Sequence, residues 1–170
     1  MGRTMPVDEM FDILPQDAAW GHEMAQDADG LELHYVRRGH GSPTVLLLHG
    51  WPGFWYDWRR VLPRLEQITS VIAMDLRGFG ASAKPDWPPR SAYSAEAQAR
   101  NVLALLDQLQ LETVLLVGYD VGSRVAQTVA QLAPGRVHRF WHTPFGASSP
   151  EGALVPAFSH ACASRSTHRS

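Results

Sequence analysis

The stretch that decides the fold is Val114-Leu-Leu-Val-Gly-Tyr-Asp-Val-Gly-Ser-Arg-Val-Ala126. Its apolar run predicts a buried strand, and the residues after the second glycine have the apolar spacing of a helix. Asp120 stands at the apex of the turn between them, in the pattern Gly118-Tyr119-Asp120-Val121-Gly122. The same pattern with serine at the centre presents a nucleophile at the end of a sheet. We therefore predict that Asp120 is a nucleophile held out from a strand end.

Glycines flank this turn because a side chain on either side of the apex would collide with the neighbouring strand or helix. Gly118 and Gly122 meet that requirement. An Asp before a helix is usually only an N-cap. A cap needs no glycine two residues upstream in a strand, so the pattern favours the nucleophile. The backbone N–H of Val121, at the start of the helix, would then point at charge that develops on a bound substrate.

Two more buried strands precede the turn. Thr44–Leu48 and Val71–Met74 are continuous apolar runs, as expected of parallel strands covered on both faces. Loops His49–Gly53 and Asp75–Ser82 follow them. Because the carboxyl ends of parallel strands meet at one edge of a sheet, we expect these loops to gather beside Asp120.

The remaining segments complete an α/β pattern. Residues 20–26 and 31–37 flank a turn and predict a β-hairpin. We expect one short or kinked helix over 54–65, irregular chain over 84–91 and a helix that begins at Ser94 as N-cap. The apolar stripe of that helix is Ala95, Ala99, Val102, Leu106 and Leu109. The fold class is therefore α/β, a mostly parallel sheet with helices on both faces.

Composition narrows the classes of partner and compartment. The 170 residues carry 15 basic and 17 acidic side chains, which gives no electrostatic reason to expect nucleic acid or an anionic membrane. A small neutral organic substrate fits better. Cys162 is the single cysteine, the chain has no long apolar run, and its first 20 residues lack a signal-peptide core. We therefore predict a cytoplasmic protein without a cofactor.

Taken together, the motifs His49-Gly50-Trp51-Pro52, Asp75-Leu76-Arg77-Gly78-Phe79-Gly80-Ala81-Ser82 and Gly118 to Gly122 resemble the α/β-hydrolase superfamily, in its epoxide hydrolase and dehalogenase branch. The resemblance covers about residues 20–140. It implies that Asp120 attacks an epoxide or a halogenated carbon and forms an alkyl-enzyme ester. It also implies an oxyanion hole built from the backbone amides of Trp51 and Val121, used when a histidine-activated water hydrolyses the ester.

Differences from the motifs of related enzymes favour epoxide opening over dehalogenation. Haloalkane dehalogenases often carry Asn and Trp as halide ligands where this chain has Trp51 and Val121. Fluoroacetate dehalogenases carry Arg directly after the nucleophile as well as at the position of Arg124, and the first of these is absent here. The epoxide hydrolase interpretation is therefore preferred, with the two dehalogenases as alternatives.

Several other residues receive supporting roles. His49 is interpreted as a hydrogen-bond partner that orders its loop, not as a base, and Arg77 as a structural anchor. His138 and His142 are spaced i, i+4, but without a third ligand nearby we predict no metal site. The residues expected to support the elbow and its loops are His49, Gly50, Pro52, Gly118, Gly122, Asp75 and Arg77.

The resemblance also implies partners that are missing. In this superfamily an acid and then a histidine follow the nucleophile. After Asp120 the chain offers the carboxylate of Glu151 and four histidines, at 138, 142, 160 and 168, none after a recognisable buried strand. From residue 141 the sequence changes to a mixture of Ser, Ala, Pro, His and Arg, which a frameshift in a GC-rich gene would produce.

We therefore divide the chain into a polar lead-in (1–19), a partial α/β-hydrolase domain (20–140) and an irregular tail (141–170). The competing functional hypothesis is a catalytically inactive, truncated fragment or a binding partner of another chain. A sheet without its last strands would expose an unpaired edge, from which we expect self-association.

Overall fold

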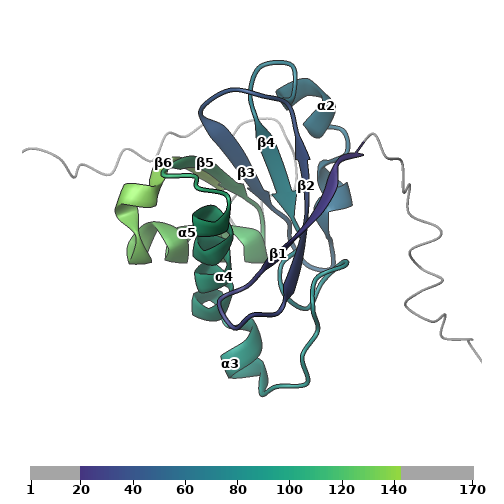
Figure 1. Ribbon diagram of the computed structural model, residues 1–170. Coiled ribbons are helices and arrows are strands. Elements are labelled where there is room, and N and C mark those ends of the chain that lie inside the picture. Colours follow the sequence, from purple (N-terminus) through teal and green to yellow (C-terminus); the bar gives the residue numbers. More distant parts are fainter. Residues whose placement is uncertain (1–19, 143–170) are drawn as a thin grey trace, which may run out of the picture.

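The computed structural model describes residues 20–142, which form a six-stranded sheet in the order β1-β2-β4-β3-β5-β6 (Figure 1). The strands are β1 (His22–Gln26), β2 (Glu32–Arg38), β3 (Thr44–Leu48), β4 (Val71–Met74), β5 (Val114–Gly118) and β6 (Val137–His142). Strands β4, β3, β5 and β6 are parallel, whereas β1 and β2 form an antiparallel hairpin at one side. The predicted mostly parallel α/β sheet is confirmed.

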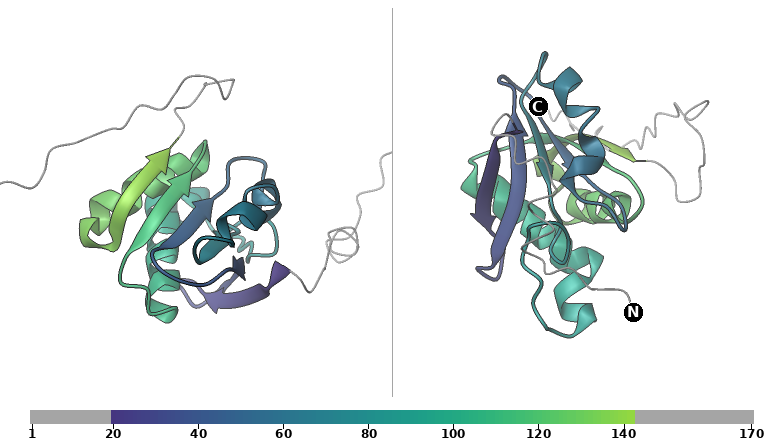
Figure 2. Two further views of the ribbon diagram at one scale, coloured as in Figure 1. Left: turned by 90° about the horizontal axis from the view of Figure 1, so that it is seen from above. Right: turned by 90° about the vertical axis from the view of Figure 1, so that its right-hand side faces the viewer.

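Helices cover both faces of this sheet (Figure 2). They are η2 (Trp55–Trp58), α2 (Leu62–Leu65), α3 (Pro89–Tyr93), α4 (Ala95–Gln108), α5 (Val121–Leu132) and η3 (Pro134–Arg136). Helices α4 and α5 pack on the larger core, which includes Leu46, Ile72 and Leu116. Leu62 and Trp55 pack on the opposite face. Among the described residues, no helix is long and apolar enough to cross a membrane.

Strand register brings the predicted loops together. Leu48 at the end of β3 pairs with Met74 of β4 on one side and with Gly118 of β5 on the other. Gly118 in turn pairs with His142, the last residue of β6. The loops after β3, β4 and β5 therefore leave the sheet at one edge.

Three local expectations need correction. The predicted helix over 54–65 is two short helices, because Pro63 lies in the first turn of α2, where its missing N–H costs nothing. The segment 84–91, expected to be irregular, contains the start of α3 at Pro89 for the same reason. The tail expected to be irregular from residue 141 does not begin there, because β6 runs through His142, so a histidine does end a parallel strand.

Helix α4 begins as predicted, since the Ser94 side chain accepts a hydrogen bond from the Ala97 amide at 3.2 Å. Its buried side differs from the predicted apolar stripe. Gln98 and Asn101 are buried, whereas Leu109 is only half-buried. The polar pair is buried because both side chains bond Arg77, as described below. The expectations for residues 1–19 and 143–170 lie outside the described residues.

Candidate active site

The candidate site is built on the turn between β5 and α5. Asp120 has φ 50° and ψ −122°, a backbone conformation that residues with a Cβ rarely adopt. Such a conformation costs on the order of 1–3 kcal/mol and persists only where the surroundings impose it. The predicted sharp turn is therefore present, with a non-glycine residue at its strained apex.

The surroundings that impose this turn are backbone atoms. A Cβ added to Gly118 would lie 2.5 Å from the carbonyl oxygen of Gly122. One added to Gly122 would lie 2.4 Å from the carbonyl oxygen of Leu48 and 2.5 Å from that of His49. Both glycines are thus required by close approach, in the positions that the sequence predicts.

The loop after β3 reaches the carboxylate of Asp120. The backbone N–H of Trp51 donates a hydrogen bond to Asp120 Oδ2 at 2.8 Å. Gly50 lies against the same turn, since a Cβ there would be 2.9 Å from the Asp120 Cβ. One of the two predicted oxyanion donors therefore already contacts the candidate nucleophile.

A cleft of about 550 Å³ opens beside the turn. It takes its lining from the loops after β3 and β4, from α3 and α4, and from the first turns of α5. The lining residues are Trp51, Leu76, Gly78, Phe79, Tyr93, Ala95, Gln98, Val121, Arg124 and Val125. Both predicted oxyanion residues, Trp51 and Val121, belong to it. The cleft is mainly apolar and aromatic, as small-molecule sites commonly are.

His49 is wholly buried and has both ring nitrogens occupied. Its Nδ1 donates to the Gly50 carbonyl oxygen at 2.8 Å, and its Nε2 accepts from the Leu76 amide at 3.0 Å. These partners fit the neutral ring, and burial lowers the pKa of His49. The side chain therefore joins the loops after β3 and β4 and has no nitrogen left for proton transfer.

Asp75, at the end of β4, also joins separate segments of the chain through its carboxylate. Its Oδ1 accepts from the Trp55 amide at 2.7 Å, and its Oδ2 accepts from the Ala81 amide at 2.9 Å. Oδ2 also lies 2.8 Å from Nδ1 of His34. This buried carboxylate consequently fixes η2 and the loop 75–82 and is not exposed to the cleft.

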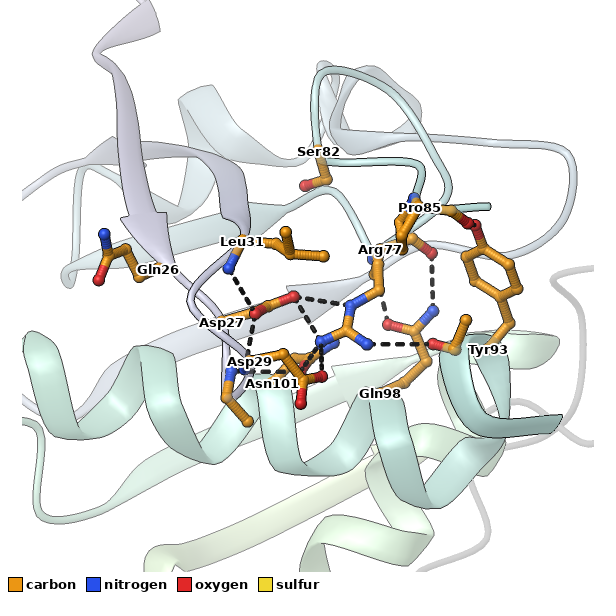
Figure 3. A network of polar contacts seen from close by, with 12 residues as sticks. Gln26, Asp27, Asp29, Leu31, Arg77, Ser82, Pro85, Tyr93, Gln98 and Asn101 are labelled. Carbon is orange, nitrogen blue, oxygen red and sulfur yellow. Dashed lines mark hydrogen bonds and ion pairs between the residues drawn. The ribbon is translucent and has the colours of Figure 1, made fainter. Parts of the chain in front are cut away.

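Arg77 is buried in a polar network that ties the hairpin to the cleft wall (Figure 3). Its guanidinium donates to Asp27 through Nε at 2.7 Å, to Asp29 at 2.5 Å and to Asn101 at 2.9 Å. Gln98 bonds both the backbone amide and the carbonyl oxygen of Arg77, at 3.1 and 2.7 Å. The network therefore connects the β1–β2 turn, the loop after β4 and α4.

Sequence reasoning missed two residues near Asp120. The hydroxyl of Tyr119 donates to Asp57 Oδ2 at 2.6 Å, although the two residues are 62 positions apart. The only signal in the sequence was the position of Tyr119 directly before Asp120. The Tyr119 side chain lies between the loop after β3 and η2, against Gly50 and Asp57.

His49 and His138 are not placed to act as a base on a water beside Asp120. His49 is occupied by its two backbone partners, and His138 lies near the amino end of β6, opposite in the sheet to the site edge. The backbone of His142 lies at the site edge, opposite Gly118. In the part of the chain that the structure describes, no cluster of three or more His, Cys, Asp or Glu side chains could hold a metal ion.

Comparison with known proteins matches residues 43–144 to the α/β-hydrolase fold family. The chain is 43% identical over 98 residues to a soluble epoxide hydrolase of Corynebacterium sp. (strain C12), a match that covers 58% of this chain and 32% of that enzyme. It is 34% identical over 136 residues to the bifunctional epoxide hydrolase 2 of Sus scrofa, which covers 78% of this chain and 24% of that protein.

Solved structures agree with these relatives. A mutant epoxide hydrolase of Vigna radiata superposes with a TM-score of 0.69 at 30% identity, over 74% of this chain and 38% of that one. An epoxide hydrolase from an endophytic Streptomyces gives a TM-score of 0.66 at 37% identity, over 71% and 36%. The chain thus spans about a third of the length of the relatives it matches.

Proposed function

The chain belongs to the α/β-hydrolase fold family, and on that premise we propose that Asp120 opens an epoxide by forming an alkyl-enzyme ester. The observation that carries this proposal is the carboxylate at the strained apex, bonded through Oδ2 to the Trp51 amide beside a mainly apolar cleft. Because that bond holds one oxygen, the other oxygen, Oδ1, is the nucleophile.

The chemistry follows from this division between the two oxygens. Oδ1 bonds to an epoxide carbon, the carbon–oxygen bond of the ring breaks, and its electron pair leaves on the former ring oxygen, which takes a proton from water. Oδ2 then becomes the carbonyl oxygen of the ester. When water adds to that ester, Oδ2 carries the negative charge, and the amides of Trp51 and Val121 would stabilise it.

The cleft favours a small neutral epoxide with an apolar or aromatic substituent. Leu76, Phe79 and Val125 supply apolar surface, and Tyr93 adds an aromatic ring whose hydroxyl is occupied by the Pro85 carbonyl oxygen at 2.6 Å. Arg124 contributes a charged side chain to the lining. An aryl epoxide is therefore the substrate class to test first.

We infer that the second step, hydrolysis of the ester, is slow. General bases typically contribute 10²–10⁴-fold to such a step. Of the described histidines, His49 and His138 are not placed to act on water beside Asp120. His142 ends β6 at the site edge, but no carboxylate lies between it and Asp120 in the sequence to orient it. The ester should therefore accumulate, and the protein would complete one chemical step far faster than it turns over.

The experiment is incubation of the purified chain with styrene oxide, followed by intact mass, peptide mapping and diol quantification. The expected result is one added epoxide mass on Asp120, with little diol. Asp120→Ala should remove the adduct, whereas Asp86→Ala, which removes an exposed carboxylate, should retain it. Labelling that is equal in the Asp120→Ala variant would disprove the nucleophile, and sustained diol release would disprove the slow second step.

Dehalogenation is tested by the same assay with a haloalkane and with fluoroacetate. Alkylation of Asp120 with halide release would favour that alternative over epoxide opening. Haloalkane dehalogenases often carry Asn and Trp as halide ligands at the positions of Trp51 and Val121. Their absence here favours the epoxide as substrate.

A second candidate function is that of a fragment or binding partner. It is favoured by the edge of the sheet at β6, the last strand in the described sheet order, where Trp141 is 45% exposed. An edge strand offers unpaired backbone groups to another chain. Sedimentation velocity should then show concentration-dependent association, which Trp141→Lys reduces, and a monomer at all concentrations would exclude this function.

A further inference from the structure

We propose that Tyr119 and Asp57 form a positioning pair that holds the Trp51 amide against the nucleophile. The pair joins the residue directly before Asp120 to helix η2, which follows the Trp51 loop. The inference rests on the proposed role of Asp120 and extends it to two residues that do not touch the substrate.

The turn that carries Trp51 packs against the Tyr119 side chain at both of its ends. Gly53 N–H donates to the Gly50 carbonyl oxygen at 2.9 Å, which closes the turn around Trp51. A Cβ on Gly50 would lie 2.3 Å from Cε2 of the Tyr119 ring. Gly50, the first residue of the turn, is therefore in close contact with the Tyr119 ring.

The second glycine contacts the other end of the same side chain. A Cβ on Gly53 would lie 1.7 Å from Asp57 Oδ2 and 3.0 Å from the Tyr119 hydroxyl. The hydrogen bond between Tyr119 and Asp57 thus lies against Gly53, at the end of the turn. Tyr119 contacts both ends of the segment 50–53, and Asp57 contacts its second end.

Packing and charge keep Tyr119 in this place. Trp58 meets its ring edge-on, with 5.5 Å between ring centroids. Burial, and after it the hydrogen bond to Asp57, raises the pKa of Tyr119 to about 12. The phenol therefore remains a neutral donor to the Asp57 carboxylate throughout the ordinary pH range.

Among the described residues, the Trp51 amide donates the hydrogen bond that reaches the Asp120 carboxylate. If the segment 50–53 moves, the Trp51 N–H loses its 2.8 Å contact with Oδ2. Asp120 then loses the hydrogen bond that gives its two oxygens different roles. A displacement of about 1 Å in a positioning element can cost roughly 100-fold in rate. Tyr119 and Asp57 act through Trp51, so they are positioning residues.

The test compares Tyr119→Phe, Asp57→Ala and Asp57→Asn in the full chain. Asn retains an oxygen that accepts from the tyrosine, so Asp57→Asn should behave nearly as the parent protein does. Tyr56→Phe is the matched control, because it removes a hydroxyl from the residue next to Asp57 in η2 and leaves the Tyr119–Asp57 bond in place.

Two measurements are made on each variant. The first is amide hydrogen exchange of Trp51 by NMR, with the buried strand amides of Leu46 and Leu116 as internal references for global stability. The second is the rate of Asp120 labelling by styrene oxide. In Tyr119→Phe and Asp57→Ala we expect Trp51 exchange to rise roughly tenfold with unchanged reference amides, and labelling to slow by roughly 10- to 100-fold.

The outcomes separate this inference from the proposed function. Unchanged Trp51 exchange in both variants would overturn the positioning role, as would labelling at the parental rate. Faster Trp51 exchange in a protein whose parent is not labelled by any epoxide would support the positioning role and reject the epoxide chemistry. If Tyr119→Phe does not fold, Asp57→Ala and its Asn counterpart still decide the question.

Discussion

Replacing Arg77 by Met tests whether the buried network holds the cleft wall. The guanidinium is fully buried and bonds two carboxylates and the amide oxygen of Asn101. Met has a similar length and no charge, so the variant removes the polar head with a small change in packing. Asp27, whose side chain is also fully buried, would then keep its charge without a cation.

The expected cost can be worked from the partners that remain. Breaking a buried ion pair by removing one member costs about 3–5 kcal/mol. Asp27 Oδ1 still accepts from the amides of Asp29 and Leu31, each at 2.8 Å, which offsets part of the loss. Asp29 is half exposed, so its share is about 0–1 kcal/mol. We therefore expect a loss of about 3 kcal/mol.

The assay is urea unfolding monitored by circular dichroism, with the free energy of unfolding extrapolated to water. Arg100→Met is the matched control, because Arg100 lies on α4 and pairs with Glu96 in an exposed i, i+4 bridge. That variant should lose no more than about 0.5 kcal/mol. If Arg77→Met and Arg100→Met lose the same stability, the network does not anchor the loop and the reasoning from burial is refuted.

Three further predictions concern the elbow and its neighbours. Gly122→Ala should destabilise the fold by about 1–3 kcal/mol, because its Cβ meets the Leu48 carbonyl oxygen, whereas Gly135→Ala, with open space around it, should stay within about 0.5 kcal/mol in the same urea assay. Asp120→Gly should abolish labelling yet stabilise the protein by about 1 kcal/mol, since glycine accepts φ 50° without strain; a loss of stability would contradict a strained apex. Finally, the raised pKa of Tyr119 means that the folded state holds the phenol proton more tightly than the unfolded state. Stability should therefore be complete below pH 10 and fall as the pH rises to about 12, with a shallower fall in Tyr119→Phe measured by thermal unfolding; an identical slope in both proteins would rule out this linkage.

The sheet could be predicted because its signals are local. Thr44–Leu48 and Val71–Met74 are nearly unbroken apolar runs, and such runs are typical of parallel strands covered on both faces. Gly118 and Gly122 could be predicted for a related reason, since the absence of a side chain is itself the signal of close backbone approach. The buried strands and the tight turn can each be predicted from a few adjacent residues.

The contacts that arrange the site could not be predicted in the same way. Asp57 is a polar residue in a helix of four residues, and nothing near it in the sequence points to a tyrosine 62 positions later. Gln98 and Asn101 interrupt an apolar stripe and would be expected at the surface, but their partner Arg77 buries them. Pairings over such distances are fixed by the fold, so they become visible only when the elements are in place.

The strain at Asp120 is sustained by the packing of α5 on the core of the sheet. Val129 and Ala126 on α5 are fully buried. Burial of a side chain such as Val contributes about 1.5–3 kcal/mol, which matches or exceeds the 1–3 kcal/mol cost of the apex conformation. Because Gly122 lies against the Leu48 carbonyl oxygen, α5 can remain packed on the sheet only while the turn stays tight. The position of Asp120 and its contact with Trp51 therefore have different supports: the first is the core packed under α5, and the second is the pair Tyr119 and Asp57 near the surface.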